Sequence, residues 1–142
     1  MRIIKLPAQL DSIGKATNLM NEMLEEADCS PQVQMQLEIV LDELMSNVAR
    51  YAYPSKDGDI TVSIDVVENP KRVVIILADS GIPYNPLERE DPDITLSAEE
   101  RKIGGLGIYI VKKYMDEITY TYQDNQNILT LVKRLDTLKI LN

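Results

Sequence analysis

The sequence contains no tryptophan, phenylalanine or histidine, and it has a single cysteine. Because the first two are missing, Ile, Leu, Val and Met must fill the interior. The lone Cys29 excludes an internal disulfide, which fits a reducing compartment. The length of 142 residues fits a single domain, 1–142, with a core large enough to be stable without disulfide bonds.

Positive charge and long apolar runs are also scarce. The 15 Lys and Arg residues face 23 Asp and Glu residues, and the formal net charge of −8 argues against a nucleic-acid surface. The longest apolar run, 73–78, is far too short to span a bilayer. The N-terminal segment MRIIKLPAQLDS is charged within its first residues and lacks the apolar run of a signal peptide. We therefore expect a cytoplasmic protein that binds neither nucleic acid nor membrane.

Hydrophobic periodicity predicts the order of the elements. A short strand over 2–6 precedes a helix over 10–24 with one apolar stripe. Ser30 and Pro31 predict the start of a second helix, as its N-cap and first helical residue, and this helix ends before Pro54. Four strands and a third helix follow: strands 59–67 and 72–79, helix 105–115, and strands 117–123 and 128–135.

These elements predict an α/β (α+β) fold, a two-layer sandwich of a mixed β-sheet with three helices on one face. Between its charged ends, Arg72 and Asp79, the strand over 72–79 is apolar throughout, which predicts an interior position in the sheet with cover on both sides. The proline-rich and charged stretch that follows has little periodicity. A loop of such length inside a compact domain predicts a lid or binding loop, at about 82–103.

Glu43 and Asn47 are four residues apart on the second helix, so they share one helix face. The Asn47 amide oxygen would offer Mg²⁺ a neutral hard ligand, and triphosphate oxygens and waters would fill the other positions. The Glu43 carboxylate, one turn away, would accept the proton of an attacking hydroxyl. For this pair alone, a solvated polar face with intrahelical hydrogen bonds is the favoured alternative.

Asp79 ends an apolar strand and precedes a turn, a common place for aspartate. Its functional interpretation is a carboxylate that accepts a hydrogen bond from the exocyclic amine of adenine, while Gly81 lets the ring approach the backbone. Such a contact would select adenine over guanine. Thr130 is a candidate for an additional hydroxyl in the same pocket, although an ordinary strand threonine is the simpler interpretation.

A glycine-rich turn opens the third helix and consists of Gly104, Gly105, Leu106 and Gly107. Glycines permit close backbone approach, and a helix N-terminus presents unpaired N–H groups to phosphate. The turn is neither a Walker A motif nor a dinucleotide fingerprint. Arg101 and Lys102 stand directly before it, in place to neutralise a γ-phosphate. A solvated charge pair is an equal alternative for these two residues.

The three segments together resemble a family, the bacterial anti-sigma factor serine/threonine kinases. Residues 43–53 (ELMSNVARYAY) resemble the N box of this family, and residues 79–86 (DSGIPYNP) resemble its first glycine box. Residues 104–108 (GGLGI), with Met115 and Asp116, resemble the second glycine box. The family lies within the superfamily of gyrase, Hsp90, histidine kinase and MutL ATPases.

The resemblance implies a Bergerat-type fold with a left-handed crossover, which holds ATP and Mg²⁺ under a lid. Glu43 matches the family's general base, Asn47 its Mg²⁺ ligand and Asp79 its adenine-reading acid. The remaining positions that match are Gly81, Gly104, Gly105, Gly107 and the adenine-pocket Thr130. Such kinases phosphorylate a Ser or Thr of a small STAS-type anti-sigma factor antagonist and, as homodimers, sequester a sigma factor. Arg50 departs from the family, since many relatives carry histidine there.

Two other functions compete with the kinase. A non-catalytic regulator would use ATP only to set its shape while it binds a sigma factor or another partner; the retained Glu43 favours the kinase over it. The catalytic domain of a two-component histidine kinase is disfavoured, because the chain has neither histidine nor a helical dimerisation segment. Gyrase-like and chaperone ATPases would need further domains.

Overall fold

The computed structural model describes residues 1–88 and 106–135. The strands are β1 (Arg2–Pro7), β2 (Asp59–Val67), β3 (Arg72–Asp79), β4 (Glu117–Gln123) and β5 (Gln126–Arg134). The helices are α1 (Ser12–Glu26), α2 (Pro31–Asn47), the π-helix η1 (Val48–Ala52), the 3₁₀ turn η2 (Pro86–Glu88) and α3 (Leu106–Tyr114). The predicted order of strands and main helices is confirmed, whereas η1 and η2 are additions that periodicity does not predict.

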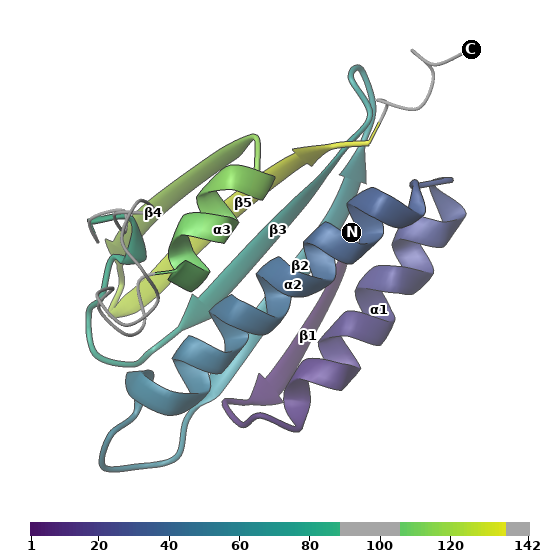
Figure 1. The fold of residues 1–142 in the computed structure, drawn as a ribbon. Coiled ribbons are helices and arrows are strands. Elements are labelled where there is room, and N and C mark those ends of the chain that lie inside the picture. The colour runs from purple at the N-terminus through teal and green to yellow at the C-terminus, as the bar shows by residue number, and fades with distance from the viewer. Residues whose placement is uncertain (89–105, 136–142) are drawn as a thin grey trace.

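The strands form one sheet in the order β1-β2-β3-β5-β4, and every adjacent pair is antiparallel (Figure 1). The two-layer sandwich is confirmed, but among the described strands the sheet is not mixed as expected. The reason is the position of β4, which follows the crossover through α3. It lies at the edge, and β5 returns by a tight turn to pair between β3 and β4.

The three helices cover one face of the sheet, with α2 lying between α1 and α3 (Figure 1). Along β3, buried positions alternate with half-buried ones from Val73 to Asp79. The interior position of β3 is therefore confirmed, but the expected cover on both faces is wrong for the described residues. On the open face, Val74, Ile76 and Ala78 are half-buried without such cover, since side chains of β2 and β5 flank them.

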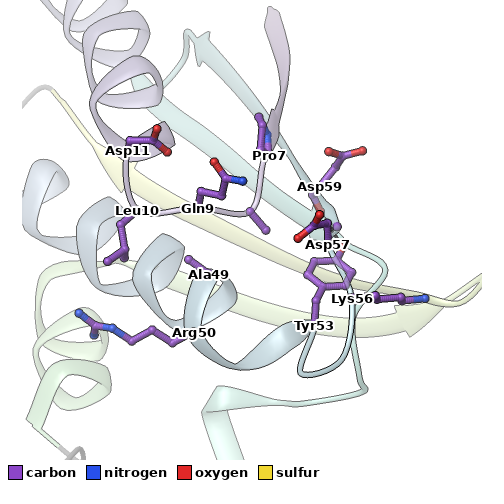
Figure 2. Close-up of a pocket in the computed structure, with 12 residues that line it drawn as sticks. Pro7, Gln9, Leu10, Asp11, Ala49, Arg50, Tyr53, Lys56, Asp57 and Asp59 are labelled. Atoms are coloured by element: carbon purple, nitrogen blue, oxygen red, sulfur yellow. Dashed lines mark hydrogen bonds between the residues drawn. The ribbon is translucent and has the colours of Figure 1, made fainter.

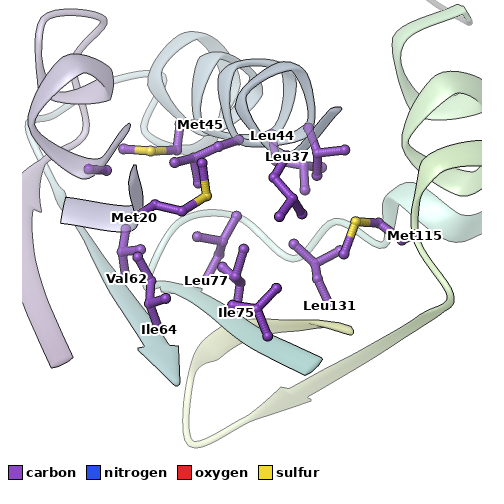
Figure 3. Close-up of a cluster of buried hydrophobic side chains, with 14 of the residues drawn as sticks. Met20, Leu37, Leu44, Met45, Val62, Ile64, Ile75, Leu77, Met115 and Leu131 are labelled. Atoms are coloured by element: carbon purple, nitrogen blue, oxygen red, sulfur yellow. The ribbon is translucent and has the colours of Figure 1, made fainter. Parts of the chain in front are cut away.

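The core lies between α2 and the sheet and is built from aliphatic side chains and methionine (Figure 3). Its fully buried members include Met20, Leu37, Ile64, Ile75 and Leu131. Each such side chain contributes about 1.5–3 kcal/mol by leaving water. This core fixes α2 over the centre of the sheet.

The start of α2 is the one that the sequence predicts. The Ser30 hydroxyl accepts a hydrogen bond from the Val33 N–H at 3.2 Å, and Pro31 is the first helical residue. The cap satisfies one of the N–H groups that have no partner within the helix. Among the described residues, no helix combines the length and apolar character needed to cross a membrane.

Candidate functional site

A cavity of about 1020 Å³ lies where the end of α2, the π-helix η1, the ends of β3 and β5 and the start of α3 meet. Five of the predicted site residues line it: Glu43, Asn47, Asp79, Leu106 and Gly107. Its apolar walls include Leu44, Val48, Leu77, Ile82, Pro86 and Leu129. The fold therefore brings segments far apart in the chain to one hollow with both polar and apolar walls.

Glu43 and Asn47 both line this cavity from α2 and are half-buried. Within the described part of the chain, neither side chain makes a hydrogen bond or an ion pair. The intrahelical hydrogen bonds of the alternative interpretation are thus not formed. The Glu43 carboxylate lies against the first turn of α3, because a Cβ placed on Gly107 would come within 1.9 Å of Glu43 Oε1. Gly107 therefore leaves the space that this carboxylate occupies.

Asp79 is buried at the end of β3, with 7% of its surface exposed. Its Oδ1 atom accepts hydrogen bonds from the Gly81 N–H at 2.9 Å and from Asn127 Nδ2 at 3.0 Å. The Oδ2 atom accepts none from the described residues. One carboxylate oxygen is thus held by the protein, while the other keeps its capacity to accept from a ligand donor.

Gly81 has a packing role that the sequence does not predict. A Cβ at this position would lie 2.4 Å from the Ala52 carbonyl oxygen of η1. The next N–H, that of Ile82, donates to the same oxygen at 2.9 Å. The missing side chain therefore admits the backbone of the π-helix, and the close approach of a ligand ring to Gly81 stays a prediction. Periodicity does not predict this π-helix, because it adds one residue to a single helical turn at a functional site.

The Tyr53 side chain connects the end of β3 with the start of β2, next to η1. Its hydroxyl accepts from the Ser80 N–H at 2.8 Å and donates to the Asp59 carbonyl at 2.6 Å. Its ring lies where a side chain on Gly58 would be. Burial raises the pKa of Tyr53, so the hydroxyl remains neutral at physiological pH and keeps donating. Within the segment that resembles the N box, this residue acts as a structural support.

Asn127 is a site residue that the sequence pattern does not predict. It is buried, pairs directly with Asp79 across β3 and β5, and lines the cavity. Thr130 was expected in this pocket, but it is three residues further along β5 and lies on the opposite, open face of the sheet. The signal that could have found Asn127 is the antiparallel register, which places it opposite Asp79 once the strand is started at Gln126.

Four further predicted residues, Arg101, Lys102, Gly104 and Gly105, lie outside the described part of the chain. Most of the predicted lid over 82–103 lies outside it as well. Its described beginning, Ile82 to Glu88, includes several residues that line the cavity.

A second cavity, of about 870 Å³, lies on the other side of η1 (Figure 2). Its walls come from the turn between β1 and α1 and from the segment between η1 and β2. Arg50 lines both cavities, and in Figure 2 its side chain points away from the acidic Asp57 and Asp59. The second cavity carries exposed charges of both signs, so it has no charge preference that would define a ligand.

The donor set at the first cavity fits a magnesium ion that is bound together with phosphate. Among the described residues, no group of three or more His, Cys, Asp or Glu side chains could hold a metal ion. The amide oxygen of Asn47, with Glu43 one turn away, offers hard oxygen ligands. Most coordination positions would then belong to phosphate oxygens and water, as Mg²⁺ prefers.

The fold and the cavity define a nucleotide-binding domain, and comparison with known proteins agrees. The chain belongs to the histidine kinase-like ATPase domain family, whose model matches residues 6–133. It is similar to the serine-protein kinase RsbW of Listeria monocytogenes, with 23% identity over 131 residues, or 89% of this chain and 82% of that protein.

Two other relatives are kinases by name. The serine-protein kinase RsbW of Bacillus thuringiensis is 29% identical over 97 residues, which is 66% of this chain and 59% of that protein. The serine/threonine-protein kinase BtrW of Bordetella bronchiseptica is 24% identical over 102 residues, 72% of this chain and 71% of that protein.

Solved structures share the fold. The RsbU and RsbW domains of Rv1364c from Mycobacterium tuberculosis match with a TM-score of 0.60 and 13% identity, over 95% of this chain and 33% of that one. The histidine kinase AdeS of Acinetobacter baumannii matches with a TM-score of 0.53 and 16% identity, over 96% of this chain and 70% of that one. These likenesses establish the α+β fold of the ATPase domain.

Proposed function

We propose that this chain is an ATP-dependent serine/threonine protein kinase that phosphorylates a STAS-type anti-sigma factor antagonist and, as a homodimer, sequesters a sigma factor in the cytoplasm. The observation that carries the proposal is the convergence of Glu43, Asn47, Asp79 and the start of α3 on one cavity. The relatives named as serine-protein kinases support it. No described group suggests a different chemistry at this cavity.

Adenine would bind at the Asp79 end of the cavity. A carboxylate oxygen accepts hydrogen bonds, and the Oδ2 atom of Asp79 accepts none from the described residues, so it suits the exocyclic amine of adenine better than the oxygen of guanine. Leu77 and Leu129, the apolar wall residues next to Asp79 and Asn127, would contact the ring faces. This arrangement accounts for an ATP site rather than a general anion site.

The phosphates would then extend toward Glu43, Asn47 and the start of α3. The Asn47 amide oxygen would hold Mg²⁺, which supplies charge neutralisation for the triphosphate when bound. The N–H groups at the α3 N-terminus favour negative charge. Gly104, Gly105, Arg101 and Lys102 would make further contacts with the phosphates, and the segment 82–103 would cover the site.

Glu43 would act on the acceptor. The Ser or Thr oxygen of the antagonist forms a bond to the γ-phosphorus, the bond to the β–γ bridging oxygen breaks, and ADP leaves. The hydroxyl proton passes to the Glu43 carboxylate, whose oxygens have no partner among the described residues. A carboxylate held by an ion pair would be a weaker acceptor for this proton.

The test is phosphotransfer by Glu43→Gln. With labelled ATP and a purified STAS-type antagonist, we expect transfer to fall about 100-fold or more, because a general base contributes on that scale. ATP affinity should stay within about threefold, since glutamine keeps the shape and one acceptor oxygen. Asp42→Asn is the matched control, because the neighbouring Asp42 is exposed and does not line the cavity.

Unchanged transfer in Glu43→Gln would show that Glu43 is not the base. A parent protein that binds ATP but labels no antagonist would instead support the non-catalytic regulator. The two failures are distinguishable, because the first concerns one residue and the second concerns the activity itself.

A further inference from the structure

Asn127 uses all the hydrogen-bonding capacity of its side-chain amide. Its Nδ2 atom donates to Asp79 Oδ1 at 3.0 Å and to the Ile82 carbonyl oxygen at 2.9 Å. Its Oδ1 atom accepts from the Tyr84 N–H at 3.0 Å and from the Tyr120 hydroxyl. An amide has two donor hydrogens and two acceptor lone pairs, so none remains for a ligand. Asn127 therefore acts on a ligand only through its neighbours.

The orientation of this amide is determined by groups that cannot exchange roles. The Tyr84 N–H can only donate, and the Ile82 carbonyl can only accept. Rotation of the amide by half a turn would set donor against donor and acceptor against acceptor. The NH₂ group must therefore face Asp79.

This orientation decides which oxygen of Asp79 is available. Asn127 Nδ2 and the Gly81 N–H both bind Oδ1, whereas Oδ2 accepts from none of the described residues and remains the acceptor available to a ligand in the cavity that Asp79 lines. Since two donors from different elements hold one oxygen, the carboxylate cannot rotate without breaking both bonds. The burial of both residues keeps water from replacing these bonds.

We propose that Asn127 is a positioning residue that sets base selectivity by holding Asp79 with one oxygen aimed at the exocyclic amine of adenine. Burial raises the pKa of Tyr120, which keeps its hydroxyl neutral and donating to Asn127. The proposal rests on ATP binding at this cavity and adds the residue through which adenine is distinguished from other bases.

The test compares ATP with purine riboside triphosphate, which lacks the exocyclic amine, by calorimetry on the full chain with Mg²⁺. For the parent we expect ATP to bind about tenfold or more tightly, as for a hydrogen bond to a charged acceptor. In Asn127→Ala and Asn127→Leu we expect the ratio to fall to about threefold or less. A merely structural role would weaken both nucleotides equally and leave the ratio unchanged.

Tyr120→Phe is the matched control, because it removes one bond to Asn127 and leaves the two bonds to Asp79 Oδ1 intact. Its ratio should stay within about twofold of the parent ratio, on the scale of an indirect effect. If Asn127→Leu does not fold, Asn127→Ala decides, since the space it leaves admits water to pair the exposed groups.

A measurement on the parent protein adds a readout that needs no variant. The Asn127 side-chain NH₂ resonances should shift on addition of ATP more than on addition of purine riboside triphosphate. An unchanged affinity ratio in the folded Asn127 variants, or equal NMR shifts with both nucleotides, would overturn the proposal. A parent that binds neither nucleotide would overturn the proposed function instead.

Discussion

A side chain added at Gly81 or at Gly107 would overlap with a neighbouring residue, but the two neighbours differ in how easily they can move. At Gly81 the obstacle is the Ala52 backbone, whose carbonyl oxygen would lie 2.4 Å from an added Cβ atom. At Gly107 it is the carboxylate of Glu43, at 1.9 Å, which is the far end of a flexible side chain. The first glycine therefore protects the packing of η1, and the second protects the position of the candidate base.

Alanine at these two glycines should separate stability from activity. Gly81→Ala should lower the free energy of unfolding by about 1–3 kcal/mol, because backbone must shift to relieve the overlap. Gly107→Ala should cost less than about 1 kcal/mol, since Glu43 can rotate away, yet phosphotransfer should fall by about tenfold or more. Urea unfolding and the phosphotransfer assay measure the two effects. Equal loss of stability in both variants, with full transfer in Gly107→Ala, would contradict this distinction.

Individual residues differ in how far the sequence predicts their place at the site. Helical spacing and a strand end fix the local positions of Glu43, Asn47 and Asp79, whereas their selection as site residues depended on the resemblance to the kinase family; all three line the cavity. Asn127 was missed because its role arises from the cross-strand pairing with Asp79. Thr130 was misplaced because sequence alone does not fix on which face of an antiparallel strand a residue lies.

At the scale of elements, α2 begins at a side-chain cap and ends at the candidate functional site. Ser30 caps its first turn, and the cavity residues Glu43 and Asn47 lie in its last turns, directly before the π-helix η1. The cap was predictable, because Ser followed by Pro is a local signal. The π-helix was not predictable, because it depends on the contact of Ala52 with Gly81 and Ile82, which are distant in sequence.

Removal of the cap should weaken the fold without altering the site. Ser30→Ala should lower the free energy of unfolding by about 1 kcal/mol, because the Val33 N–H loses its acceptor. ATP affinity should be unchanged, since the cap and the cavity lie at opposite ends of the helix. Ser55→Ala, at an exposed position, is the control and should change stability by less than about 0.5 kcal/mol. A larger effect at Ser55 than at Ser30 in urea unfolding would contradict the prediction.

At the scale of the whole molecule, the order of the strands and helices brings the site residues together. Because β5 pairs with β3, Asn127 meets Asp79, and because α3 follows β3 in the chain and packs beside α2, Gly107 meets Glu43. The two-layer class could be predicted from periodicity and order. The antiparallel pairing of every described strand and the uncovered second face could not, because a continuous apolar strand is equally compatible with a sheet covered on both sides.

Residues of both layers of the fold line the site. Nucleotide binding should therefore stabilise the entire domain. At about 100 times the dissociation constant, Mg²⁺-ATP should add about 2.7 kcal/mol, which raises the Tm by about 5–10 °C for a domain of this size. Removal of Mg²⁺ with EDTA should diminish the shift, because Asn47 alone does not neutralise the phosphates.

Two variants make this thermal shift specific to the cavity. Asp79→Asn should lose most of it, since an amide can present N–H groups toward the adenine amine in place of an acceptor. Thr130→Val should keep all of it, because Thr130 lies on the opposite face of the sheet. Differential scanning fluorimetry on the three proteins measures both expectations. A full shift in Asp79→Asn, or a lost shift in Thr130→Val, would place the nucleotide elsewhere on the molecule.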